Sequence, residues 1–106
     1  MSTSSERKAM GQTLAAYALM RPHMVGKFLD LSVMTVKDML DKGVIPSIGE
    51  KKRRRVDPLD VCVYALAERE GITTEDYWRI HGEAVPERAA RYYRAILKLQ
   101  AEASQR

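Results

Sequence analysis

The sequence contains a single cysteine, Cys62, among its 106 residues, so no disulfide can form within the chain. A protein without disulfides is typical of a reducing compartment. No apolar run approaches the roughly 18 residues that a membrane-spanning helix needs, and no signal sequence opens the chain. These absences predict a soluble, cytoplasmic protein that does not contact a membrane.

Catalytic and metal-binding patterns are also missing. The only candidate metal ligands among histidine and cysteine are His23, His81 and Cys62, and their spacing suits no known type of site. There is no Ser/His/Asp or Cys/His set and no glycine loop that could hold a phosphate. We therefore expect no enzyme activity, no metal and no cofactor.

The length and composition of the chain fit a single globular domain. Hydrophobic residues make up 45% of the chain, whereas aromatic residues make up only 7%. This composition is typical of a globular protein, and the core should consist mainly of Leu, Val, Ile, Met and Ala.

The positive charge is concentrated in one place. The formal net charge is +4, and the segment from Gly49 to Val56, here called the basic segment, carries five cations against Glu50. Five minus one is four, so the rest of the chain is formally neutral. Such a local field indicates a docking edge for an anionic partner rather than a uniformly basic surface. The five cations are Lys51, Lys52, Arg53, Arg54 and Arg55.

Two short helices precede the basic segment. Apolar residues at helical spacing predict a helix over residues 23–30 and a second helix over residues 33–42. Between them, Leu31 and Ser32 form a turn in which Ser32 is placed to cap the second helix. Gly43 is placed to end that helix in a left-handed conformation.

Residues 44–56 predict a two-stranded β-hairpin with the basic segment at its tip. Pro46 fits an edge strand only, which such a hairpin supplies. The tip cannot fold inward, because five like charges would lose their hydration together. We expect it to project from a compact three-helix support; a helical segment, or cations folded onto the protein's own carboxylates, would contradict this. A solvated face and a nuclear import signal are the alternative interpretations of the charge run.

Helices should also follow the basic segment. Asp57 and Pro58 predict the start of a helix that Gly71 ends, and a threonine at 73 or 74 predicts the cap of a short helix that ends near Gly82. Pro86 then opens the most regular amphipathic pattern in the chain. Its apolar face packs on its own domain or mediates self-association, through Tyr92, Tyr93, Ile96 and Leu99.

The expected fold class is therefore mainly α with a small two-stranded β-hairpin. A winged helix-turn-helix core over residues 22–70 would be preceded by an N-terminal arm over residues 1–21. A helical extension over residues 71–106 would pack on the core or mediate oligomerisation. The arm contains a moderate helical pattern over residues 6–20; it either covers the core or binds a partner.

This arrangement predicts a DNA interface on the helix over residues 33–42 and on the wing over residues 49–56. Lys37 could contact a guanine edge, Thr35 a phosphate, and Met34 or Val33 a thymine methyl group. Asp38 and Asp41 depart from such an interface, since carboxylates repel phosphates, although an aspartate can accept from a cytosine amino group. The candidate DNA-binding residues are Ser32, Met34, Thr35, Lys37, Lys51, Lys52, Arg53, Arg54 and Arg55.

The same stretch resembles the excisionase-like winged helices of the MerR-type superfamily. The resemblance rests on Leu31-Ser32, Thr35-Val36, Gly43, Ile45-Pro46, the arginines 53–55 and the helix start at residues 57–60; the run 39–48 looks most like the Cox-type regulatory proteins of temperate phages. It implies a recombination directionality factor (excisionase), a transcriptional repressor, or both. It further implies binding to repeated sites on double-stranded DNA in the cytoplasm, with oligomerisation and a recombinase as partner.

Two other functions remain open from the sequence. A protein-interaction adaptor would use the last helix and leave the basic segment to solubility. An RNA-binding protein would use the basic segment on a different nucleic acid. DNA shift assays, gel filtration and competition with RNA distinguish the three.

Overall fold

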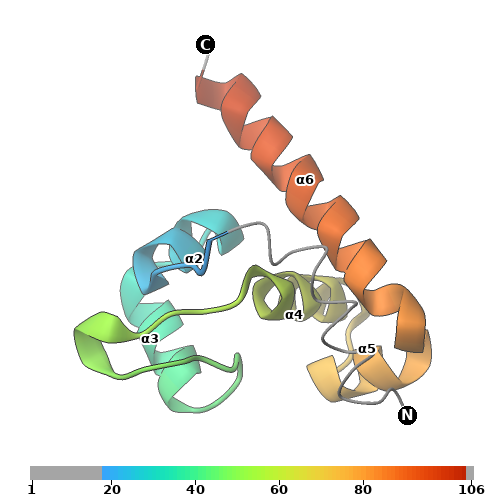
Figure 1. Ribbon diagram of the computed structural model, residues 1–106, viewed down its shortest axis with the longest axis horizontal. Helices are drawn as coiled ribbons and strands as arrows, with labels where there is room; N and C mark the ends of the chain where they lie inside the picture. The colour runs from blue at the N-terminus through green and yellow to red at the C-terminus, as the bar shows by residue number, and fades with distance from the viewer. Residues whose placement is uncertain (1–17, 105–106) are drawn as a thin grey trace.

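The structure is a computed structural model, and it describes residues 18–104 (Figure 1). Five α-helices and two short 3₁₀ helices occur in this part of the chain. They are α2 (Pro22–Leu29), α3 (Val33–Asp41), η1 (Lys51–Arg53), α4 (Pro58–Glu70), α5 (Thr74–His81), η2 (Gly82–Ala84) and α6 (Val85–Ser104). The helix predicted over residues 6–20 lies outside the described residues, apart from its last three positions, residues 18–20, which are not helical.

Helices α2 and α3 form a tight pair. α2 ends at Leu29, and its C-cap residue Asp30 has a left-handed backbone (φ 59°). Ser32 caps α3 by accepting a hydrogen bond from the Thr35 N–H at 3.1 Å. The turn passes very close to α2: a Cβ at Gly26 would lie 2.6 Å from the carbonyl oxygen of Leu31. Glycine therefore permits the approach of the two helices, and the predicted cap at Ser32 is confirmed.

Helix α4 lies at the centre of the molecule. Asp57 caps it by accepting from the Leu59 N–H at 2.8 Å, and Gly71 ends it with φ 70°, both as predicted. Because α4 packs against α5 and α6 and against the α2–α3 pair, side chains around most of its circumference are buried. These are Val61, Cys62, Val63, Ala65 and Ala67.

The main core joins all of the longer helices except α5. From α6, Ala89, Ala90 and Tyr93 belong to the same cluster as Val25 and Phe28 of α2. The rings of Phe28 and Tyr93 stack with their centroids 5.5 Å apart. A second, smaller cluster packs Tyr77 of α5 against α4. Its other members are Val63, Ala67 and Val85.

The predicted β-hairpin is wrong, and with it the winged form of the fold. No β-strand occurs within residues 18–104; the chain between α3 and α4 makes only two isolated antiparallel bridges, Ile48 with Arg55 and Met20 with Val56. Val56 pairs with the segment before α2 rather than with the chain after α3, and Gly49 (φ 82°) leads directly into η1. A hairpin needs a run of paired residues, and one bridge does not supply it.

No helix within residues 18–104 is long and apolar enough to cross a membrane.

Candidate nucleic-acid interface

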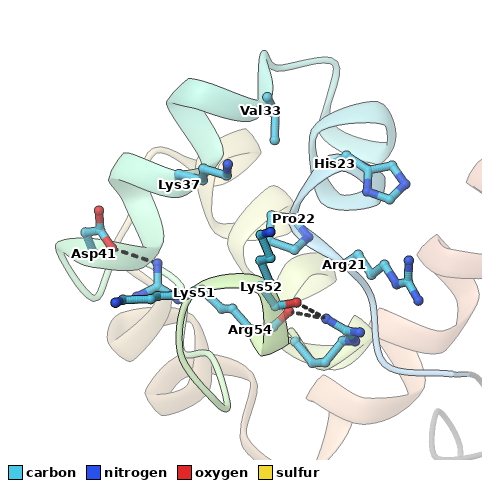
Figure 2. A pocket seen from close by; sticks show the side chains of 10 residues that line it. Arg21, Pro22, His23, Val33, Lys37, Asp41, Lys51, Lys52 and Arg54 are labelled. Carbon is cyan, nitrogen blue, oxygen red and sulfur yellow. Dashed lines mark hydrogen bonds and ion pairs between the residues drawn. The ribbon is translucent and has the colours of Figure 1, made fainter.

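An open groove of about 540 Å³ lies between the start of α2, one side of α3 and the basic segment (Figure 2). Six cationic side chains and one carboxylate line it, so its electrostatic field attracts anions. The cations come from three separate parts of the chain: Arg21 before α2, Lys37 on α3, and Lys51, Lys52, Arg54 and Arg55 in the basic segment.

The Met20–Val56 bridge explains why these parts meet. Two backbone hydrogen bonds of 2.8 Å join the two residues, and they place Arg21 directly beside the C-terminal end of the basic segment. Val25 and Val56 are both fully buried in the same core cluster, which fixes α2 and the basic segment against each other. The groove is therefore built on packed elements rather than on a free loop.

The tip of the basic segment presents three cations to solvent. Lys51, Lys52 and Arg53 are exposed, but they form the 3₁₀ helix η1, so the prediction of a non-helical β-finger at this tip is wrong. The turn is closed by Gly49, where a Cβ would lie 2.6 Å from the carbonyl oxygen of Arg53 and where φ is positive. Only glycine fits both conditions, so the compact tip depends on this residue.

The last two cations of the segment are not free, contrary to the prediction that all five project. Arg54 donates from Nη1 to Oδ1 of Asp41 at 2.7 Å, and its side chain is only 21% exposed. Arg55 donates from Nη1 to the carbonyl oxygens of Lys52 (3.2 Å) and Arg54 (2.9 Å). One cation thus pairs with the protein's own carboxylate (Figure 2). Another folds back to brace the turn.

On α3, the predicted residues divide between the groove and the surface next to it. Lys37 lines the groove together with Val33, whereas Met34 lies outside the lining and is 75% exposed. Ser32 and Thr35 also lie outside it; their hydroxyls are 2.9 Å apart in a hydrogen bond with each other. α3 therefore offers one cation, two exposed apolar side chains and two hydroxyls on its outer side.

Sequence reasoning missed Arg21 and His23, which line the groove from the start of α2. Both are isolated in the sequence and lie about thirty residues before the basic segment. They lie near the basic segment because of the Met20–Val56 bridge, a long-range contact that no local sequence pattern predicts.

The predicted oligomerisation residues on α6 divide into two groups. Tyr93 is buried in the protein's own core, and Tyr92 and Ile96 are half-buried, with the Tyr92 ring edge-on to Phe28 at 6.0 Å. Leu99 is 60% exposed, on the part of α6 that extends past the other helices (Figure 1). The first half of the helix packs on its own domain, and the second half is accessible.

No other chemical centre is evident in residues 18–104. This part of the chain contains no group of three His, Cys, Asp or Glu side chains that could hold a metal ion. The Cys62 thiol is fully buried, and burial, with a smaller contribution from the charge of Asp57, raises its pKa to about 12. A neutral, enclosed thiol is a packing group.

The sequence matches no protein-family model, no curated protein and no solved structure, so the geometry of the groove carries the functional argument.

Proposed function

We propose that the protein binds double-stranded DNA, with α3 directed at the base edges and the groove and basic segment on the phosphate backbone. The observation that carries the proposal is the convergence of six cations on one open groove, from three segments that are far apart in sequence. Arg21, Lys37, Lys51 and Lys52 form no ion pair among the described residues. Four uncompensated charges at one place suit a polyanion.

The exposed outer side of α3 supports DNA over a small anion. Met34 and Val33 are apolar, exposed and adjacent to Lys37. Next to a phosphate-binding groove, such side chains suit thymine methyl groups, and a lysine suits a guanine edge. A small anion would use the cations alone and would leave this apolar patch without a role.

The finer role follows from the resemblance to excisionase-like proteins. A regulator of that kind acts as a recombination directionality factor or a transcriptional repressor, and several copies bind repeated sites. One module of this size buries only about 600–1,000 Å², so repeated sites would supply the missing specificity. Footprinting on DNA that flanks the gene tests this role: regularly spaced protected segments are expected, and a single isolated footprint would contradict it.

The binding itself is tested by fluorescence anisotropy with a labelled duplex at several salt concentrations. If Lys51, Lys52 and Arg53 each neutralise one phosphate, the logarithm of affinity falls with the logarithm of salt with a slope of about −2.7 or steeper. The triple variant K51A/K52A/R53A should weaken binding to all sequences alike and flatten the slope. The variant Lys37→Ala should change the preference among sequences instead.

A matched control removes three cations from the exposed side of α6, as R91A/R94A/K98A. It changes the net charge by the same amount at a distance from the groove, so the slope should stay close to that of the wild type. An equal loss in both triple variants would mean that only net charge matters. A salt-independent interaction, or a preference for an RNA duplex in competition, would overturn the proposal.

A further inference from the structure

Asp41 is the one carboxylate among the side chains that line the groove. It is the last residue of α3, and its Oδ1 accepts a hydrogen bond from Nη1 of Arg54 at 2.7 Å. The carboxylate is 66% exposed, whereas the arginine side chain is 21% exposed. The pair therefore stands at the wall of the groove with its negative partner toward solvent (Figure 2).

The hydrogen bonding of Arg54 is incomplete. Its Nε is buried and has no hydrogen-bond partner among the described residues. A guanidinium presents its donors as a planar fork that fits two oxygens of a phosphate at once. In this arrangement the fork cannot do so, because one arm is taken by Asp41 and Nε faces the interior. Arg54 can offer this two-armed contact to a phosphate only if its hydrogen bond with Asp41 opens.

We propose that Asp41 limits sequence-independent binding of a DNA backbone by withholding Arg54 from it. This inference rests on the proposed function. The Asp41 carboxylate pairs with the Arg54 guanidinium, which would otherwise neutralise a phosphate. Its own negative charge also repels phosphates from that end of the groove. Backbone contacts are thereby confined to Arg21, Lys51, Lys52 and Arg53. Since backbone contacts carry no sequence information, their restriction raises the relative weight of the base contacts made by α3.

The test is the variant Asp41→Asn, which keeps the size of the side chain and removes its charge. On a duplex of random sequence, its affinity should rise several-fold over that of the wild type. The salt slope should become steeper by about 0.9, because Arg54 then neutralises one further phosphate.

Asp38→Asn is the matched control. Asp38 is on the same helix, is 60% exposed, and pairs with Lys42 at 2.9 Å outside the groove. The substitution Asp38→Asn removes the same charge as Asp41→Asn, so any general electrostatic gain in DNA affinity appears in both variants. Equal gains for the two variants would overturn the proposal. In the background Arg54→Met, the gain from Asp41→Asn should fall to that of Asp38→Asn; a full gain there would also overturn it.

An NMR measurement of the free protein separates this inference from the proposed function. The Arg54 Nε–Hε resonance should shift in Asp41→Asn and stay in place in Asp38→Asn. A resonance that is the same in all three proteins means that the pair does not form in solution, and the inference fails while DNA binding stands. A wild type that shows no salt-dependent binding to a duplex overturns the proposed function itself, and the inference with it.

Discussion

At the scale of single residues, the cap of α3 shows how one side chain positions the interface. Ser32 Oγ accepts from the Thr35 N–H at 3.1 Å and so satisfies an amide that the helix leaves unpaired. Replacement by alanine removes the acceptor, and the free energy of unfolding should fall by about 1 kcal/mol. Urea denaturation followed by circular dichroism measures the change. Ser32→Asp, which keeps an acceptor, should retain most of the stability; equal losses would contradict the role of the cap.

The buried thiol of Cys62 predicts a dependence of stability on pH. Its pKa is about 12 in the folded protein against an ordinary value of 9.0, because burial disfavours the thiolate. In the unfolded chain the thiol deprotonates at lower pH than in the folded one, so its contribution to stability is complete below pH 9 and is lost as the pH rises toward 12. Urea midpoints should therefore decline over this range.

Cys62→Ala is the control for this decline. The variant should be less stable at pH 8, since it leaves a small cavity, but its midpoint should fall less steeply above pH 9. Some decline should remain, because burial also raises the pKa of Tyr64 and Tyr92. A decline identical to that of the wild type would mean that the thiol does not contribute.

Residue-level features were predictable where their cause is local. The caps at Ser32, Asp57 and Thr73 each accept from an amide two or three residues further on, so both partners belong to the same short stretch of sequence. The pairing of Arg54 with Asp41 was not predictable in the same way. It depends on the path of the chain between α3 and α4, which brings together side chains thirteen positions apart.

At the scale of elements, α6 is one continuous helix with two different environments. Tyr93, in its first half, is buried against Phe28, whereas Leu99, in its second half, is 60% exposed. Tyr93→Ala should lower the free energy of unfolding by about 3 kcal/mol or more. Leu99→Ala should change it by less than about 0.5 kcal/mol. Thermal and urea denaturation at low protein concentration measure both.

The variant Leu99→Ala also reports on self-association. If copies of the chain meet through the free half of α6, Leu99→Ala should destabilise the protein only at high concentration, because assembly then adds burial. Sedimentation velocity over a range of concentrations would detect the assembly directly. A wild type that stays monomeric throughout would contradict the oligomerisation predicted for this face.

The element that sequence reasoning misjudged is the basic segment. Apolar residues on both sides of a charged tip fit a hairpin, and they fit a braced loop equally well. What decides between them is the partner of Val56, which is Met20 before α2 rather than a residue after α3. The exposure of Lys51, Lys52 and Arg53 was predictable, since clustered cations remain hydrated in either conformation.

At the scale of the whole molecule, the groove and α6 are separate parts of one packed structure. No residue of α6 lines the groove. Even so, Ala89, Ala90 and Tyr93 share a core cluster with Val25, Val36 and Val56, which hold the three walls of the groove together. In a domain of this size the core is thin, so the loss of a whole helix removes a large part of the burial. The integrity of the groove should therefore depend on a helix that does not touch it.

A chain that ends at residue 84 tests this dependence. Without α6, the core loses three fully buried side chains, Val85, Ala89 and Ala90, as well as the ring that stacks on Phe28. We expect no cooperative urea transition and no salt-dependent DNA binding, although every residue of the groove is still present. A chain that ends at residue 98 keeps the buried half of the helix and should retain both properties. If the shorter chain unfolded cooperatively and bound DNA with the wild-type slope, α2 to α5 would form a self-sufficient unit, and the shared core would not be what holds the groove in shape.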